Sequence, residues 1–98
     1  MIRHVVVFKW NDGVDQAHVE ATSAAFSRLP ALIPEIIAYH HGPDLGVGEG
    51  NFDYAVAALF DSVDDFLAYR AHPEHVALVS TYLAPHWAER RAVQFEED

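Results

Sequence analysis

The feature that most constrains the fold is a pair of predicted strands that are apolar on both faces. Residues 1–10 and 52–60 are rich in valine, alanine and aromatic residues, which favour β-strands. Alternate side chains of a strand point to the same face, so residues of one parity (odd or even residue number) form one face and residues of the other parity form the opposite face. On the first strand, Val5 and Val7 form one apolar face, and Ile2, Val6 and Phe8 form the other. On the second strand, Ala55, Ala57 and Leu59 form one apolar face, and Phe52, Val56 and Phe60 form the other.

A chain of 98 residues is too short to cover both faces of such a sheet with its own helices. The uncovered face would expose several hundred Å² of apolar surface, which is more than monomers usually leave open. The simplest cover is a second copy of the same chain. We therefore predict a homodimer, in which Leu59 has the parity that faces the partner.

The order of the predicted elements indicates the fold class. It is strand, helix, strand, strand, broken helix, strand, which is the split βαβ pattern of α+β ferredoxin-like folds with a four-stranded antiparallel sheet. Nothing divides residues 1–98, so we expect a single domain. The predicted bounds are strand 1–10, helix 15–29 ended by Pro30 and Pro34, strand 36–41, strand 52–60, helix to about 71 capped by Ser62, a new helix from Pro73 capped by His72 and ended by Pro85, and strand 89–96.

The charge and composition exclude several classes of function. The net charge of -9, with six Lys and Arg, disfavours nucleic acid and anionic membrane surfaces as partners. No apolar run is long enough to span a membrane, and no cysteine is present to form a disulfide or a thiolate zinc site. The glycine-rich segment 46–50 precedes a strand instead of opening a helix, so it does not fit a phosphate-binding loop. We expect a soluble cytoplasmic protein.

The segment from Tyr69 to His75 carries the most chemistry. It combines a phenol with two imidazoles at a predicted break between helices, and these groups can exchange protons near neutral pH. His75 shares a helix face with Val79, so it should point toward the sheet as a general base would. A structural role in pairing buried backbone groups is the alternative. Tyr69 should also point inward, either as an oxyanion donor or as a hydrogen-bonded core tyrosine.

The other histidines also have a structural and a functional alternative. His72 precedes Pro73, which favours a helix cap over chemistry. His4 shares a face with Val6 and lies near His75 if that face meets the helices. His40 and His41 are adjacent in a strand and point to opposite faces, so they cannot chelate one ion together. We therefore predict no metal site, and no serine or cysteine motif indicates a nucleophile.

The segments Ile2–Lys9 and Asn51–Tyr54, and the pattern Tyr69-x-x-His72-Pro-x-His75, resemble the stress-responsive A/B barrel (Dabb) domain. The resemblance implies a homodimeric α+β barrel. The family includes a plant polyketide cyclase that forms olivetolic acid by a cofactor-free, aldol-type ring closure. Its acid/base tyrosine and histidine correspond to Tyr69 and His75, and its first-strand histidine corresponds to His4. A pocket tyrosine and a third-strand histidine of the cyclase are replaced by Phe26 and Tyr54.

Three functions follow as hypotheses. The first is a pocket for a small hydrophobic or aromatic ligand, where His75, Tyr69 and His4 perform cofactor-free acid/base chemistry. The second is a cofactor-independent monooxygenase, and the third is a non-catalytic stress-response or binding protein. A cleft that holds Tyr69 and His75 together favours the first two, whereas a packed core there favours the third. The remaining side chains expected to line the pocket are Phe8, Phe26, Tyr54, His72 and Val79.

Overall fold

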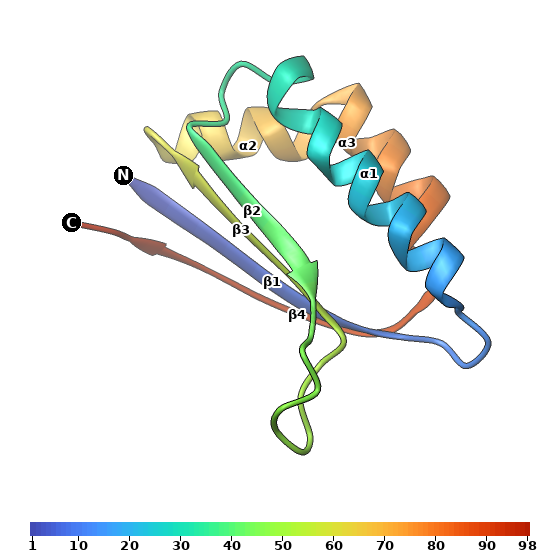
Figure 1. The fold of residues 1–98 in the computed structure, drawn as a ribbon. Helices are drawn as coiled ribbons and strands as arrows, with labels where there is room; N and C mark the ends of the chain where they lie inside the picture. Colours follow the sequence, from blue (N-terminus) through green and yellow to red (C-terminus); the bar gives the residue numbers. More distant parts are fainter.

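The computed structural model describes residues 1–98 as a ferredoxin-like α+β fold with one antiparallel sheet (Figure 1). The sheet has four strands in the order β2-β3-β1-β4, so β1 lies in the centre beside β3. The predicted order of elements is confirmed. The bounds are β1 Ile2–Trp10, α1 Gln16–Leu32, β2 Ala38–Pro43, β3 Tyr54–Phe60, α2 Val63–Ala71, α3 Pro73–Leu78, the π-helical turn η1 Val79–Leu83, and β4 Trp87–Glu96.

The two parts of the broken helix each begin with the predicted side-chain cap. The hydroxyl of Ser62 accepts a hydrogen bond from the Asp65 backbone N–H at 3.2 Å and begins α2. Nδ1 of His72 accepts from the Glu74 N–H at 3.1 Å, and Pro73 is the first residue of α3. The helix then continues as the π-helical turn η1 before the chain reaches β4. The sequence pattern did not predict this turn.

The predicted end of the first helix was wrong. Pro30 lies inside α1, which continues to Leu32 and ends where the Ile33 N–H donates to the Leu29 carbonyl at 2.9 Å. A proline lacks the N–H that would bond the carbonyl four residues earlier, so Pro30 removes one helical hydrogen bond. It lies in the last turn of α1, where only a short stretch of helix follows it. The interruption comes instead before Pro34, consistent with the extended backbone that a following proline favours.

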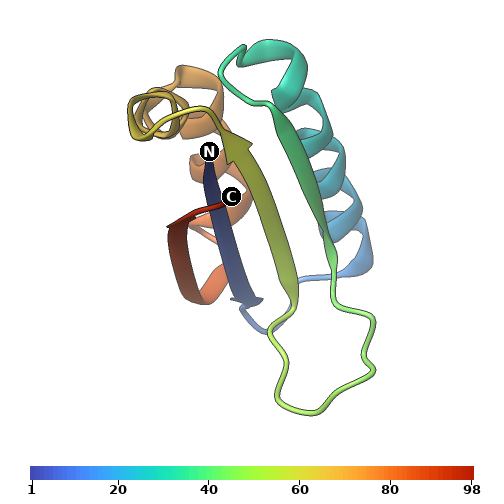
Figure 2. The same cartoon turned by 90° about the vertical axis from the view of Figure 1, so that its left-hand side faces the viewer.

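The two faces of the sheet differ in their cover. The face that carries His4, Val6 and Phe8 lies under the helices, and these side chains are buried. On the opposite face, Val5 pairs in register with Ala57 on β3 and with Val93 on β4. No helix lies over this second face (Figure 2). It is apolar without being buried, as the two-sided strands predicted.

Leu59 lies on this uncovered face. Its register partner on β1 is Arg3, which has the odd parity of Val5 and Val7. The apolar surface continues onto β4, where Val93 is 54% and Phe95 47% exposed. Among the helices, none combines the length and the apolar character that crossing a membrane requires.

Candidate active site

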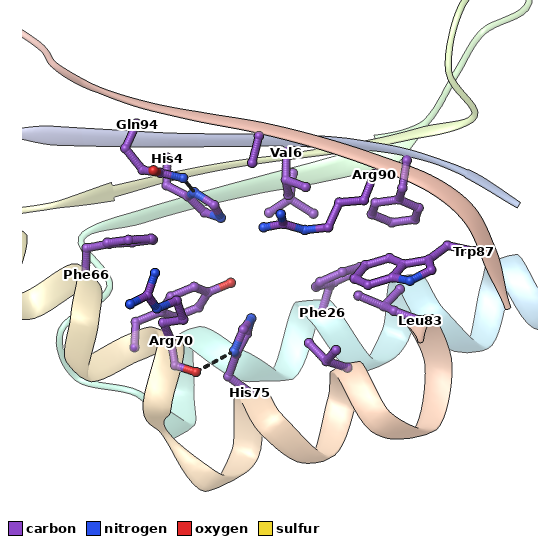
Figure 3. Close-up of a pocket in the computed structure, with 15 residues that line it drawn as sticks. His4, Val6, Phe26, Phe66, Arg70, His75, Leu83, Trp87, Arg90 and Gln94 are labelled. Atoms are coloured by element: carbon purple, nitrogen blue, oxygen red, sulfur yellow. Dashed lines mark hydrogen bonds between the residues drawn. The ribbon is translucent and has the colours of Figure 1, made fainter. Parts of the chain in front are cut away.

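A cavity of about 470 Å³ separates the sheet from the broken helix (Figure 3). The sheet supplies one wall, and α2, α3 and η1 supply the other. Because β4 is an edge strand with no helix packed on it, its side chains form the open rim of the cavity. The lining residues are His4, Val6, Phe8, Phe26, Val56, Phe66, Tyr69, Arg70, His75, Val79, Leu83, Trp87, Arg90, Ala92 and Gln94.

The cavity brings together most of the residues that the sequence singled out. His4, Tyr69 and His75 all line it, although they come from β1, α2 and α3. The ring centroids of Tyr69 and His75 lie 4.4 Å apart, and those of Tyr69 and His4 lie 6.2 Å apart. The predicted apolar neighbours Phe8, Phe26 and Val79 also line the cavity.

Two of the predicted pocket residues lie elsewhere. The Tyr54 ring stacks on Phe8, and its hydroxyl turns away to bond Ser23 at 2.8 Å and His41 at 2.9 Å. The large Phe8 ring therefore stands between Tyr54 and the cavity. His72 uses Nδ1 to cap α3, which holds its ring at the helix start. Neither Tyr54 nor His72 therefore lines this cavity, in contrast to the expectation from the sequence.

His75 presents an unprotonated nitrogen to the cavity. Its Nδ1 lies 3.1 Å from the Arg70 carbonyl, and a carbonyl only accepts, so Nδ1 carries the proton. Burial is the main cause that lowers the pKa of His75 below 6.5, and the ring is therefore neutral at pH 7. Nε2 then keeps its lone pair, and Figure 3 shows it directed away from Arg70 and into the pocket. This is the arrangement that a general base requires.

His4 has the opposite tautomer. The side-chain amide of Gln94 donates to His4 Nδ1 at 2.9 Å, so the proton of the neutral ring lies on Nε2. His4 is only 5% exposed, and burial lowers its pKa to about 4, with a further contribution from the charge of Arg90. The ring is neutral at pH 7, and its Nε2–H is a hydrogen-bond donor beside the cavity.

Tyr69 adds a second donor. Its hydroxyl lies 2.7 Å from the hydroxyl of Tyr39, a β2 residue that the sequence analysis did not select. Burial raises the pKa of Tyr69 to about 12, and burial also raises the pKa of Tyr39, so both remain protonated at neutral pH. When Tyr39 donates to Tyr69, the Tyr69 O–H is free to donate into the cavity.

The side chains that β4 contributes to the cavity were not predicted from the sequence. Arg90, Ala92 and Gln94 line the cavity because they pair in register with Phe8, Val6 and His4 on β1. Extending the parity of β1 across an antiparallel ladder to the last strand would have found them. Trp87 was not predicted to line the cavity because β4 begins at this residue, before the predicted start at residue 89.

The placement of the remaining histidines offers no metal ligand set. His41 faces the helices and His40 the open side of the sheet, as predicted, since they pair with Val56 and Ala57. No group of three His, Cys, Asp or Glu residues is arranged to hold a metal ion.

The pKa of His4 predicts how stability depends on pH. The unfolded chain binds a proton at His4 near pH 6.5, whereas the folded chain does so only near pH 4. Because the unfolded state binds the proton first, the free energy of unfolding should fall as pH falls from 6.5 to 4. The His4 contribution is at most about 3 kcal/mol, since one pKa unit corresponds to about 1.4 kcal/mol.

Urea unfolding at pH 7 and pH 5 measures this effect. His41 and His75 also have pKa values lowered by burial and add to the same slope, so the variant isolates the His4 share. His4→Asn keeps an acceptor for Gln94 and should lose less stability between the two pH values than the wild type. An equal loss in both proteins would show that folding does not lower the pKa of His4.

Comparisons with known proteins agree with this architecture. Residues 2–97 match the model of the Stress Responsive A/B Barrel Domain. A solved structure from Thermobifida fusca, described as a dimeric ferredoxin-like protein of unknown function, is 49% identical with a TM-score of 0.89, and the alignment covers 96% of this chain and 88% of that one. An uncharacterized protein of Streptomyces coelicolor is 33% identical, covering 84% of this chain and 87% of its own.

One relative is a named enzyme. Olivetolic acid cyclase from Cannabis sativa is 26% identical over 83% of this chain and 82% of its own length. The family match covers nearly all residues from β1 to the end of β4, which is the part of the chain that builds the cavity. The protein therefore belongs to the stress-responsive A/B barrel domain family.

Proposed function

We propose that the protein is a cofactor-free acid/base catalyst that acts on a C–H bond next to a carbonyl, in an aldol-type reaction of a polyketide-like or aromatic compound. One observation carries this proposal. A single cavity contains the bare Nε2 of His75 together with the N–H of His4, and the Tyr69 hydroxyl is a second donor when it accepts the hydrogen bond of Tyr39. Catalysis of enolate formation needs this combination of a base and donors in one desolvated site.

The proposed reaction uses these groups in sequence. Nε2 of His75 removes the proton, and the C–H electron pair moves into an enolate whose oxygen accepts a hydrogen bond from Tyr69. The enolate carbon then attacks a second carbonyl of the same molecule, and the new alkoxide takes the proton from His75. No electron acceptor is required. His4 is placed to donate to either developing oxyanion, and the aromatic walls exclude water from the reacting atoms.

Hydrogen–deuterium exchange tests the proposal without knowledge of the natural substrate. Acetophenone has a weakly acidic methyl group beside a carbonyl and an aromatic ring that fits the apolar walls. In D₂O, the wild type should speed the loss of the methyl proton signal above the buffer background, and it should do so without oxygen. Exchange at the background rate, with the ketone shown by chemical-shift changes to occupy the cavity, would contradict the proposal and favour a binding role.

The same experiment separates the oxygenase alternative. A cofactor-independent monooxygenase would consume oxygen with an electron-rich quinol, whereas the proposed chemistry proceeds in its absence. We favour proton transfer because the geometry supplies a base and donors, and each has a defined protonation state at neutral pH.

We also propose that the protein is a homodimer that joins two sheets through the uncovered faces. The support is the apolar face formed by Val5, Val7, Leu59, Val93 and Phe95, of which Val93 and Phe95 are half exposed in a single chain. The same face carries Arg3, whose charge is paired with Glu97. The solved Thermobifida fusca relative is described as dimeric. Burial of this surface against a second copy is the ordinary route to a closed, symmetric assembly.

A further inference from the structure

The charges that line the cavity are opposite to those of the whole molecule. The chain has 15 Asp and Glu but only six Lys and Arg. Nevertheless, the cavity is lined by Arg70 and Arg90 and by no carboxylate. In a molecule of net charge -9, a pocket of this kind is a local site of positive potential.

Neither arginine has a carboxylate partner. The two ion pairs of the structure join Arg3 to Glu97 and Arg91 to Glu89. Arg70 and Arg90 are instead held by aromatic rings, with the guanidinium carbons 5.6 Å from the Phe66 centroid and 6.0 Å from the Trp87 centroid. A contact with an aromatic ring uses the positive charge without a hydrogen-bond acceptor, so the side-chain N–H groups of both arginines remain available for another partner.

Arg90 also lies close to the proposed catalytic groups. Figure 3 shows its side chain reaching from β4 into the middle of the pocket, between His4 and Trp87. Its charge adds to the burial that lowers the pKa of His4 and of His75, and it partly opposes the burial that raises the pKa of Tyr69. Arg70 acts in the same direction on the pKa of His4. An anion bound by Arg90 would therefore lie within reach of the base and the donors.

We infer that the pocket selects ligands that carry a carboxylate on an aromatic or apolar body, with Arg90 as the principal anion-binding residue and Arg70 as a second cation at the same site. A guanidinium and a carboxylate form paired, charge-assisted hydrogen bonds. The aromatic side chains Phe8, Phe26 and Trp87 supply the complementary surface for the rest of the ligand. The inference rests on the proposed function only in taking this cavity as the ligand site, and it specifies the substrate class.

Equilibrium binding tests it separately from catalysis. The probes are 4-acetylbenzoate and the nearly isosteric neutral amide 4-acetylbenzamide, each titrated by calorimetry into the intact wild type. The carboxylate should bind at least about tenfold more tightly than the amide, since charge-assisted hydrogen bonds are roughly twice as strong as neutral ones. Arg90→Gln should reduce this preference severalfold, and the double variant Arg70→Gln, Arg90→Gln should abolish it.

Arg28→Gln is the matched control. It removes the same charge from an exposed position on α1 that does not line the cavity, so it should keep the wild-type preference. Melting temperatures would establish that every variant is folded. Equal affinity of the wild type for acid and amide, undetectable binding of both, or an unchanged preference in the double variant would each overturn the inference. Since these titrations require no proton transfer, loss of deuterium exchange with retained carboxylate preference would contradict only the catalytic proposal.

Discussion

Replacing His75 by alanine should lower the rate of proton exchange by a factor of about 10² to 10⁴, because that is the usual contribution of a general base. The variant removes the bare Nε2 from the cavity and leaves His4 and Tyr69 in place. It also deletes the hydrogen bond to the Arg70 carbonyl, so the melting temperature should fall modestly. The measurement compares the exchange rate and the melting temperature of variant and wild type.

His72→Ala is the control for this effect. His72 is in the same segment, but its ring caps α3 instead of lining the cavity. Loss of the cap should cost about 1 kcal/mol of stability and change the rate little. Tyr69→Phe should keep the fold, because the ring remains, and should lower the rate, because the oxyanion donor is lost. Equal rates for the wild type and His75→Ala would contradict the catalytic role of His75 and favour a binding or structural role for the protein.

Leu59→Asp should convert the protein from dimer to monomer at low micromolar concentration. Leu59 lies on the uncovered sheet face opposite Arg3, whose guanidinium is already paired with Glu97, so a carboxylate buried here would lack a free cation and cost several kcal/mol. A penalty of about 4 kcal/mol raises the dissociation constant by about 10³. Sedimentation should give about twice 11.0 kDa for the wild type and about 11.0 kDa for the variant.

Leu67→Asp is the control, because it adds the same charge at a position outside the proposed interface. Leu67 lies on α2, away from the uncovered sheet face, and is 40% exposed, so an added carboxylate there should remain hydrated and leave the dimer intact. A folded, monomeric wild type at micromolar concentration would contradict the dimer proposal, and so would a Leu59→Asp variant that sediments as a dimer.

The fold was predictable because strong local signals agreed with the pattern along the chain. Parity placed Val6 and Phe8 on one face of β1 and Leu59 on the opposite face of the sheet. Ser62 and His72 were recognisable as caps from their positions before predicted helices, and both form the expected hydrogen bonds. The end of α1 was not predictable from Pro30, because a proline removes one helical hydrogen bond without fixing the residue at which the helix ends.

The candidate site was predictable in part, for the same physical reason. The helix spacing of His75 and Tyr69 determines where they point, so both were expected to face the sheet. Tyr54 was assigned to the pocket from the resemblance to the plant cyclase, and such a correspondence does not determine which ring covers another in this chain. Arg90 and Gln94 enter the cavity through their register with β1, which depends on tertiary pairing instead of local sequence. Tyr39 was missed because its role depends on contact with a residue 30 positions away.

The central claim is that His75 offers a bare nitrogen to the cavity at neutral pH while His4 offers an N–H. Long-range proton–nitrogen correlation spectra of ¹⁵N-labelled protein at pH 7 report the protonation of each ring nitrogen directly. The structure predicts a proton on Nδ1 and none on Nε2 for His75, and the reverse for His4. A protonated Nε2 on His75, whether in the other tautomer or in a doubly protonated ring, would contradict the claim.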